Sequence, residues 1–262
     1  MMNSINKTLY IPLYGKAYVS KKGCFLCDIK AEEIWEKEAF PLRGKSKSKW
    51  LAYYMGIRSA VFDGWLQGKL SQAEDAVILH LGCGMDSRIL RVPSDGHKWY
   101  DVDFPQVIQE RNRYYTESAQ YRMIGADIRN PDWFKQIPEK KRAIIVMEGV
   151  SMYLTFSELQ GLFHALSAHF DDFTLLMDCY TGWAARLSKY KNPIHDVGVA
   201  KVYGMDDPAS LESASLVFVK EHDMTPPHLI HELHGAERFI FKTLYAGHLS
   251  KKLYRLYEYQ KA

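Results

Sequence analysis

The chain has 262 residues, of which 47% are hydrophobic and 13% aromatic, enough apolar material for one large domain with a buried core. Its 34 basic and 31 acidic residues leave a formal net charge of only +3, which does not indicate nucleic-acid binding. No apolar run is long enough to cross a membrane, and the N-terminus lacks the apolar stretch of a signal peptide. We therefore expect a cytoplasmic protein that binds neither nucleic acid nor membrane.

The four cysteines are typical of a reducing compartment rather than a disulfide framework. Cys24 and Cys27 form a C-x-x-C motif, a spacing that also occurs in redox and zinc sites. No βαβ pattern adjoins the motif and no second ligand pair is evident in the sequence. We expect no metal site there, and the sequence leaves the role of this pair open.

Residues 1–72 predict a helical cover in front of a sheet. The apolar segment Leu9–Tyr18 is broken by a proline and a glycine, which predicts an irregular or short helical lead-in. Ala31–Glu38 is rich in strong helix formers. Apolar residues recur at helical spacing from Trp50 to Leu66 and predict a long amphipathic helix.

Between residues 73 and 180, short apolar runs alternate with helical patterns, and this alternation indicates a parallel, doubly wound α/β sheet. The predicted strands are Val77–Leu81, Lys98–Asp103, Tyr121–Asp127, Ala143–Met147 and Phe173–Asp178, and the predicted helices begin near Phe104, Asp132 and Glu158.

The regularity fades after residue 180. Residues 181–215 predict a lid or substrate-facing excursion, because they carry glycines and prolines but little periodicity. Leu216–His222 then predicts a sixth strand. A helix over Ala236–Leu253 and a last strand over Arg255–Gln260 are expected to close the sheet, so that residues 216–262 form its C-terminal end.

A Gly-x-Gly turn follows the first predicted strand, at the start of an expected helix. Gly82 and Gly84 allow the backbone to approach a ligand closely, and a helix N-terminus offers unpaired N–H groups. The next strand ends at Asp103, an acid about twenty residues further on, as in nucleotide sites that hold a ribose. Ser87 and Arg88 stand where a dinucleotide fingerprint needs its third glycine. The pattern therefore favours a ligand with a ribose but without phosphates.

Acids follow four of the predicted strands, and the carboxyl ends of parallel strands meet at one edge of a sheet. In a nucleoside pocket, Asp103 would bind the ribose hydroxyls, Asp127 an exocyclic amine of adenine, and Glu148 an amino group or cationic centre. The fourth acid, Asp178, is the least defined. Such a set favours a ligand that carries positive charge.

Other interpretations of these acids stay open. Asp101 has the same orientation along its strand as Asp103 and could take the ribose instead. Asp127 could cap a helix beginning at Pro131. Asp178 could contact the substrate or could bond only to backbone amides.

Three motifs in the same order resemble those of a known family. Leu81–Arg88 is similar to L-G-x-G-x-D-[ST]-R, Trp99–Pro105 to [FY]-[ED]-x-D-x-P, and Glu148–Leu154 to E-G-x-x-M-Y-L. The sequence therefore resembles the leucine carboxyl methyltransferase and polyketide O-methyltransferase family, a branch of the class I methyltransferases that depend on S-adenosylmethionine (SAM). The resemblance covers nearly the whole chain.

This resemblance implies a single class I domain with a Rossmann-like, seven-stranded, mostly parallel sheet that binds SAM and releases S-adenosylhomocysteine (SAH). By family position, Lys16 and Arg58 would hold the methionine carboxylate, Gly82 and Gly84 would accommodate the cofactor, Asp103 would bind the ribose, Asp127 and Ile128 the adenine, and Glu148 the methionine amino group. Many relatives of the polyketide type carry arginine at the position of Lys16, and lysine keeps the charge but loses the bidentate grip.

The implied reaction is methyl transfer to a carboxylate or hydroxyl of a small molecule. The enzyme mainly aligns the two reactants, and only an alcohol or phenol acceptor needs a base, for which His195, His222 and Tyr203 are candidates. The alternatives are methylation of a protein C-terminus, against which an aromatic lid with Trp183 and Tyr190 argues, and a catalytically silent binding protein. The sequence leaves the acceptor, the catalytic residues and the oligomeric state open.

Overall fold

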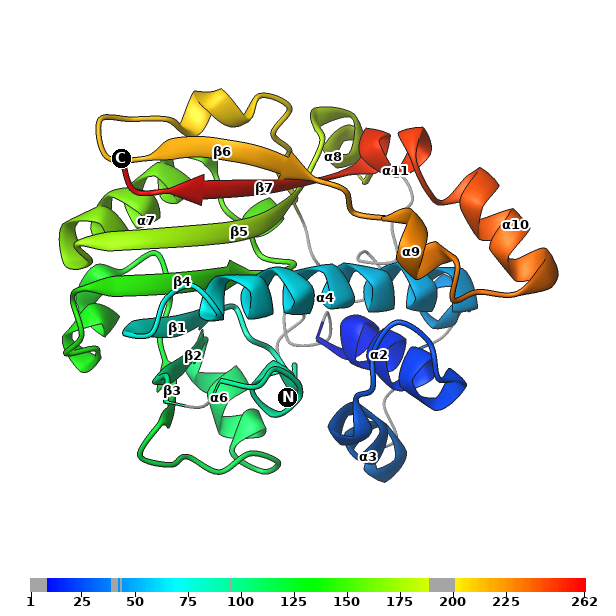
Figure 1. Cartoon of the computed structure of the whole chain (residues 1–262), viewed down its shortest axis with the longest axis horizontal. Coiled ribbons are helices and arrows are strands. Elements are labelled where there is room, and N and C mark those ends of the chain that lie inside the picture. The colour runs from blue at the N-terminus through cyan, green and yellow to red at the C-terminus, as the bar shows by residue number, and fades with distance from the viewer. Residues whose placement is uncertain (1–8, 39–41, 43, 95, 189–200) are drawn as a thin grey trace.

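A seven-stranded sheet forms the centre of the protein in a computed structural model, which describes residues 9–38, 42, 44–94, 96–188 and 201–262 (Figure 1). The strand order is β3-β2-β1-β4-β5-β7-β6. The first five strands are parallel, and β7 is antiparallel to both of its neighbours. This confirms the predicted fold class. The strands are β1 Ala76–Leu81, β2 Trp99–Asp103, β3 Tyr121–Gly125, β4 Arg142–Met147, β5 Asp172–Tyr180, β6 Val217–His222 and β7 Tyr254–Gln260.

Helices precede the sheet, connect its strands and extend from its C-terminal part. In the described ranges, none of them has both the length and the apolarity to cross a membrane. The α-helices are α2 Tyr10–Lys22, α3 Ile29–Lys37, α4 Lys49–Leu70, α5 Arg88–Arg91, α6 Pro105–Arg111, α7 Phe156–His169, α8 Gly182–Ser188, α9 Pro227–Ile230, α10 Gly235–Leu244 and α11 His248–Leu253; short 3-10 turns cover Gly44–Lys47, Pro131–Gln136, Ser151–Tyr153 and Pro208–Leu211.

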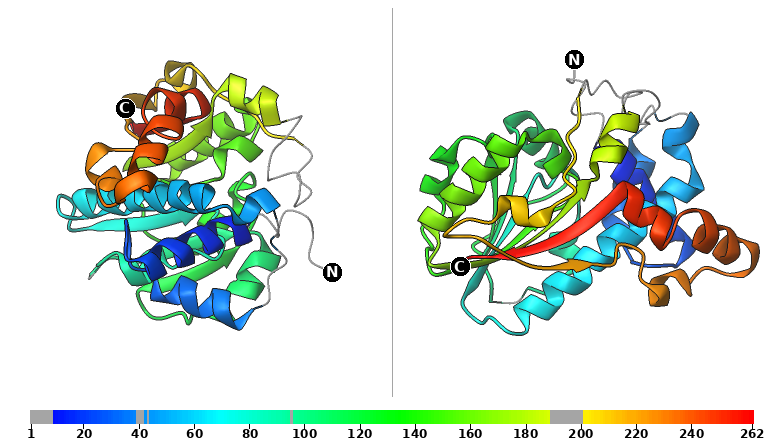
Figure 2. Two further views of the ribbon diagram at one scale, coloured as in Figure 1. Left: turned by 90° about the vertical axis from the view of Figure 1, so that its right-hand side faces the viewer. Right: turned by 90° about the horizontal axis from the view of Figure 1, so that it is seen from above.

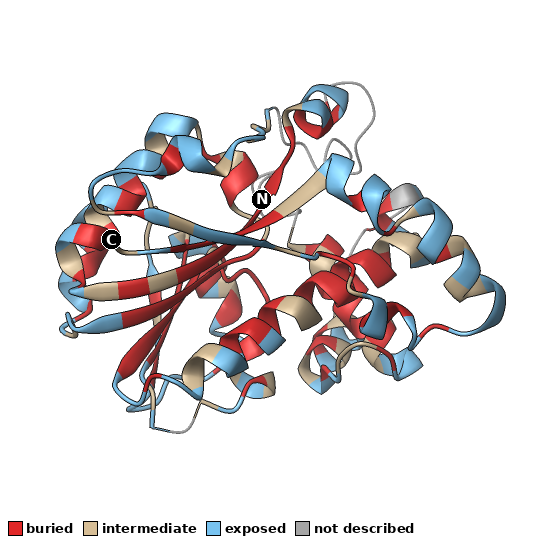
Figure 3. Cartoon of the chain, turned by 45° about the horizontal axis from the view of Figure 1, so that its top comes forward, coloured by how far each residue is buried: buried red, intermediate tan, exposed pale blue. Residues whose placement is uncertain are grey.

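Alternate residues of the central strands point into two separate hydrophobic cores. Ile144 and Val146 belong to the core that contains α4, whereas Ile145 and Met147 belong to the core that contains α7. The inner strands are therefore buried along almost their whole length (Figure 3). This explains why β4 has an uninterrupted apolar run rather than an alternating pattern.

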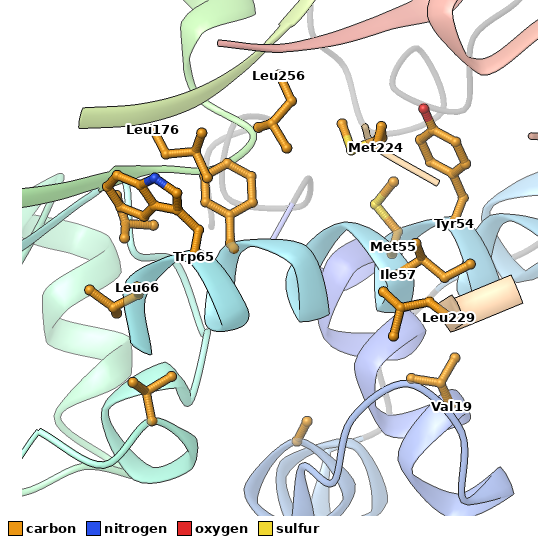
Figure 4. Close-up of a cluster of buried hydrophobic side chains, with 14 of the residues drawn as sticks. Val19, Tyr54, Met55, Ile57, Trp65, Leu66, Leu176, Met224, Leu229 and Leu256 are labelled. Carbon is orange, nitrogen blue, oxygen red and sulfur yellow. The ribbon is translucent and has the colours of Figure 1, made fainter. Parts of the chain in front are cut away.

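Helix α4 is the main contact between the sheet and the helical cover. Its Trp65 shares one buried cluster with Leu176 of β5, Leu256 of β7 and Val19 of α2, and Figure 4 shows these side chains above and below the helix. The Ser48 side chain accepts a hydrogen bond from the helix N-terminus and so helps to fix where the helix begins. The predicted amphipathic helix is thus present, and it is buried on more than one side.

Helix α2 is longer and more regular than the lead-in that the sequence predicts. It is continuous through Pro12 and Gly15. The proline lies in the first turn, where its missing N–H has no acceptor within the helix. The glycine allows close helix crossing, because a Cβ atom there would lie 2.7 Å from Cβ of Met55 in α4.

The C-terminal part differs from the prediction of one helix over residues 236–253. The chain forms α10 and α11, which are separated at Gly247, a residue with a φ of 59° that other residues rarely adopt. The sequence analysis also missed α9. The helices between β6 and β7 lie beside α4 (Figure 2), where Phe241 of α10 packs edge to face on Tyr53 with 6.1 Å between ring centroids.

The segment between β5 and β6 begins with α8 and returns along the end of β5. Tyr203 N donates to Met152 O and Met205 N to Tyr180 O, both at 2.8 Å. The boundaries of the predicted lid stay a prediction. Tyr190, which is named for the lid, and the candidate base His195 lie outside the described ranges.

Two glycines of α4 provide a test of this packing. A Cβ at Gly56 would lie 2.7 Å from Val19 Cγ2, whereas nothing lies within 4 Å of that position at Gly64. Gly56→Ala should lower the free energy of unfolding by about 1–3 kcal/mol through overpacking. Gly64→Ala should raise it by about 0.5–1 kcal/mol through helix propensity. Urea unfolding checks both, and equal effects of the two substitutions would contradict the close α2–α4 contact.

Candidate functional site

A cavity of about 370 Å³ lies at the carboxyl ends of β1, β4 and β5. Its lining comes from these strand ends, from α2, α4 and α8, and from the α11–β7 junction. Five of the eight residues that the sequence analysis selected for the cofactor line it, namely Lys16, Arg58, Gly82, Gly84 and Glu148. The other three, Asp103, Asp127 and Ile128, are not among its lining residues.

The Gly82–Gly84 turn needs glycine for two reasons. Both residues have positive φ, 66° and 52°, in the left-handed region. A Cβ at Gly82 would lie 2.2 Å from Val150 Cγ2, and one at Gly84 would lie 3.0 Å from Leu9 Cδ2. We expected the missing side chains to leave room for a ligand. At these two positions the protein itself occupies much of that room, while the turn still forms part of the cavity wall.

Glu148 is held between two buried arginines. Arg58 Nε donates to one carboxylate oxygen at 3.0 Å, and Arg88 Nη2 donates to the other. Burial would raise the pKa of Glu148, but the two guanidinium charges outweigh burial and lower the pKa to about 2. Glu148 is therefore a fixed negative charge in the cavity wall.

Arg58 also joins Glu148 to Asp178. Its Nη1 donates to Asp178 Oδ2 at 2.9 Å, and the second oxygen of Asp178 accepts from Gly149 N at 2.6 Å. Asp178 is fully buried inside β5, two residues before the strand ends. Of the two predicted alternatives, the bond to a backbone amide is present, and an ion pair with Arg58 accompanies it.

Asp86 connects this group to the N-terminal helices. Lys16 Nζ lies 3.0 Å from one of its oxygens and Arg91 Nη1 lies 2.8 Å from the other. Burial would raise the pKa of Asp86, but the charges of Arg88, Arg91 and Lys16 hold it well below its ordinary value. This carboxylate is therefore ionised at neutral pH.

The connected ion pairs form one buried network with more acids than bases. It joins five carboxylates, Asp28, Asp63, Asp86, Glu148 and Asp178, to four cations, Lys16, Arg58, Arg88 and Arg91. Counted by formal charge, the described part of the network has one negative charge in excess. Buried charge of one sign favours a ligand of the opposite sign.

Sequence reasoning missed the role of Arg88. It noted this residue only because it stands where a dinucleotide motif has glycine, yet its guanidinium is fully buried and contacts Asp63, His80 and Glu148. The available signal was the arginine that ends the Leu81–Arg88 motif. An arginine beside a ligand turn points to an ion pair, but its partners come from distant segments and cannot be identified from spacing.

Asp103 lies directly behind the glycine turn. Its carboxylate oxygens accept from Gly84 N at 2.8 Å and from Phe104 N at 2.7 Å. Burial raises the pKa of Asp103 to about 6, although these two N–H groups act in the opposite direction. Each carboxylate oxygen can accept a further hydrogen bond.

Asp101, the alternative ribose ligand, is used by the protein itself. Its oxygens accept from Trp99 Nε1 at 2.8 Å and from the Tyr121 hydroxyl at 2.6 Å, and it forms an ion pair with Arg111. Arg111 in turn donates to the carbonyl of Gly84 at 3.0 Å. Asp101 therefore stabilises the glycine turn through Arg111, and its own oxygens are occupied. Asp103 is thus the better placed of the two acids to bind a ribose.

Asp127 and Ile128 follow β3 and are partly exposed. Asp127 pairs with Arg129, whose hydrogen bonds lower the pKa of Asp127. The helical turn at residue 131 is capped by Asn130, whose side chain accepts from Asp132 N, so capping is not the role of Asp127. The adenine role of Asp127 and Ile128 stays a prediction.

The base candidates lie away from the cavity or outside the described ranges. His222 pairs with Glu258 across β6 and β7 at 2.5 Å and does not line the cavity, and neither does Tyr203. His195 lies in the range that the structure does not describe. Within the described residues no group of three or more His, Cys, Asp or Glu side chains could hold a metal ion.

Replacement of Arg88 tests how much the free energy of unfolding depends on the buried network. Arg88→Met leaves Glu148 and Asp63 short of a buried partner, which should cost about 3–5 kcal/mol of unfolding free energy at neutral pH. The cost should shrink as the pH falls toward about 4.5, because Glu148, no longer held at a pKa of about 2, can then take up a proton.

The matched control for this variant is Arg129→Met, which removes an exposed ion pair and should cost about 0–1 kcal/mol. Chemical unfolding at several pH values measures both variants. If the two variants lose the same free energy of unfolding, or if the loss in Arg88→Met does not depend on pH, the network is not buried and ionised.

Comparisons with solved structures agree with the fold. A crystal structure of a candidate methyltransferase from Thermobifida fusca has a TM-score of 0.55 at 13% identity, over 80% of this chain and 82% of that chain. Magnesium protoporphyrin IX methyltransferase of Synechocystis, solved with bound SAH, has a TM-score of 0.50 at 12% identity, over 98% of this chain and 100% of that chain.

Comparisons of sequence identify the family. A family model described as leucine carboxyl methyltransferase matches residues 12–167. TcmP of Streptomyces glaucescens, an O-methyltransferase of tetracenomycin polyketide synthesis, is 31% identical over 217 residues, which cover 81% of this chain and 79% of TcmP. The SAM-dependent methyltransferase dpfgK of Gibberella zeae is 29% identical over 184 residues, 64% of this chain and 62% of dpfgK. The chain belongs to the leucine carboxyl methyltransferase family, which confirms the family and the enzyme class that its motifs predict.

Proposed function

We propose that this protein is an O-methyltransferase that uses SAM to methylate a carboxylate or hydroxyl of a small molecule, with a carboxylate as the favoured acceptor. The observation that carries this proposal is the cavity wall itself, where a network with one excess carboxylate meets the glycine turn at the ends of β1 and β4. Two relatives, the O-methyltransferase TcmP and the SAM-dependent methyltransferase dpfgK, support the same reaction.

The charge of SAM fits this network. SAM has a positive sulfonium, a positive amino group and a negative carboxylate, so its net charge is +1 and balances the excess carboxylate. Electrostatic attraction between these charges is strong in a buried site, where the effective dielectric constant is low. When bound, SAM supplies a methyl group that its positive sulfur has already activated.

Three residues at one end of the cavity are suited to the methionine part of SAM. Glu148 would accept hydrogen bonds from the amino group. Arg58 uses Nε and Nη1 for Glu148 and Asp178, and a guanidinium has five N–H donors, so Nη2 can bind the carboxylate. Lys16 Nζ, which holds Asp86 at 3.0 Å, has further donors for the same carboxylate.

The ribose and adenine would extend past the glycine turn toward the ends of β2 and β3. Asp103 lies behind Gly84 and would accept hydrogen bonds from ribose hydroxyls. Asp127 and Ile128 lie beyond it, after β3, and would contact the adenine. This arrangement follows the order of the strands in the sheet.

The cavity favours an acceptor that arrives already ionised. His80 is a histidine in its lining, and its Nε2 lies 3.1 Å from Nη1 of Arg88, so it accepts a hydrogen bond from that guanidinium. Burial lowers the pKa of His80 and keeps the ring neutral, with this nitrogen already in use. A carboxylate needs no base at neutral pH, and the protein then has only to align its oxygen with the methyl group and to exclude water.

Methyl-transfer assays test the reaction. The purified protein is incubated with SAM labelled in its methyl group and with aromatic carboxylic acids, phenols, or a peptide that ends in leucine. We expect label in the carboxylic acids first. Label only in the peptide would favour the alternative of a protein C-terminus, and SAM binding without transfer to any acceptor would favour a silent binding protein.

The role of Lys16 is tested by comparing two ligands. SAH has the methionine carboxylate, whereas 5′-methylthioadenosine lacks the whole amino-acid part. Lys16→Met should weaken SAH binding about ten- to hundredfold, as for loss of a hydrogen bond to a charged group, and leave methylthioadenosine affinity unchanged. Asp86 keeps Arg88 and Arg91 as partners, so the variant should stay folded. Calorimetry giving equal losses for both ligands would contradict this assignment.

The role of Asp103 is tested by pH. Its pKa is about 6 in the free protein, and ribose hydroxyls that donate to the carboxylate would favour the ionised form. SAH affinity should therefore be constant above about pH 6 and fall below it, approaching about tenfold per pH unit. Asp103→Asn, which does not titrate, should bind SAH more weakly at neutral pH and lose this dependence. Parallel pH profiles for the two proteins would exclude Asp103 as the ribose ligand.

A further inference from the structure

The wall of the cavity opposite the N-terminal helices differs from the charged wall in the residue types that line it. It comes from the 3-10 turn Ser151–Tyr153, from the end of β5, from α8 and from the α11–β7 junction, and it is largely apolar. Its lining residues include Met152, Tyr180, Ala184, Leu187, Leu253 and Tyr254. The only hydroxyl groups that β5 and β7 bring to this part of the described lining are those of the two tyrosines.

Tyr180 and Tyr254 form an aromatic pair whose position is fixed by the sheet. They are cross-strand partners in the antiparallel β5–β7 ladder, and their rings meet edge to face with centroids 4.6 Å apart. Their side chains are also hydrogen-bonded to each other. The β-sheet therefore fixes both rings, so their hydroxyls need little reordering when a ligand binds.

The pair stands beside the charged end of the cavity. Tyr254 lies within electrostatic reach of Arg58, which holds Glu148, and of Asp178, the second carboxylate bound to Arg58. Burial raises the pKa of Tyr254 well above its ordinary value, so the phenol keeps its proton at neutral pH. A neutral phenol is a hydrogen-bond donor and not a base.

We propose that the Tyr180–Tyr254 pair positions the acceptor, with the Tyr254 hydroxyl donating a hydrogen bond to one oxygen of an acceptor carboxylate whose apolar body lies against Met152, Leu187 and Leu253. This inference rests on the proposed function and adds a residue that selects and orients its acceptor. A phenol has one O–H to donate and lone pairs that accept, so when the ligand binds, the Tyr254 O–H rotates to the ligand and Tyr254 accepts from the Tyr180 hydroxyl.

The second carboxylate oxygen is then the nucleophile. Its lone pair forms the new bond to the methyl carbon, the bond from that carbon to sulfur breaks, and the sulfur keeps the electron pair and becomes the neutral thioether of SAH. No proton moves, which agrees with a positioning residue that is itself a neutral donor. An acceptor with an apolar body and one carboxylate fits this wall.

Tyr54 provides a matched control. Its ring centroid lies 5.5 Å from that of Tyr254, and burial also raises its pKa, but its hydroxyl bonds to Ser250 Oγ at 2.8 Å and it is not among the cavity-lining residues. Tyr54→Phe and Tyr254→Phe each remove one buried hydroxyl from the same aromatic group. Only Tyr254→Phe should change the affinity for a ligand that binds in the cavity.

The test uses 2-naphthoate as the anionic probe and naphthalene as its neutral counterpart, with calorimetry in the presence of saturating SAH. Tyr254→Phe should weaken 2-naphthoate binding about tenfold or more, the effect of one hydrogen bond to a charged group, while naphthalene and SAH affinities change less than about twofold. Tyr54→Phe should leave all three affinities unchanged. Thermal melting of each variant with SAH verifies that it is folded.

The outcomes separate this inference from the proposed function. If the wild-type protein does not bind SAH, the proposed function fails and the inference fails with it. If SAH binds but wild-type protein does not bind 2-naphthoate, or Tyr254→Phe binds it as tightly as wild type, only the tyrosine inference is overturned. An equal loss for 2-naphthoate and naphthalene would also overturn it, because that result indicates a general change of shape.

Discussion

Glu148 shared between Arg58 and Arg88 is the contact on which the site depends. The three side chains come from the end of β4, from the middle of α4 and from the start of α5, so this one group joins the sheet to the N-terminal cover. Buried charges are stable only when they are paired, and removal of one partner costs more than the pair contributes. The geometry of the cavity therefore depends on the docking of α4, which Gly56 and the surrounding apolar cluster make possible.

The same network explains why the two walls of the cavity differ. On the N-terminal side, fixed charges are oriented before any ligand arrives, which is how a preorganised site stabilises charge at little cost in reorganisation. On the side of β5 and β7, apolar residues and the Tyr180–Tyr254 pair provide shape and neutral donors. A charged cofactor and an apolar acceptor with one anionic group fit these two walls, and the methyl group would pass between them.

The sequence predicted much of this, and the misses have physical reasons. The apolar run of β4 and the helical spacing in α4 are local signals of burial, and both elements formed as expected. The break at Gly247 depends on one backbone angle, and the uninterrupted α2 on a crossing with α4, so neither is visible in a local pattern. Arg88 was misjudged for a related reason, since its partners are separated from it by up to 60 residues in sequence.

A crystal structure of the protein with SAH tests the central claim most directly, because it shows whether a ligand completes the buried network. The account predicts that the amino group lies within hydrogen-bond distance of Glu148, that the carboxylate lies at Arg58 and Lys16, and that the ribose lies at Asp103. A complex with SAH bound elsewhere, with the Arg58–Glu148–Arg88 group closed and no ligand beside the Gly82–Gly84 turn, would contradict it.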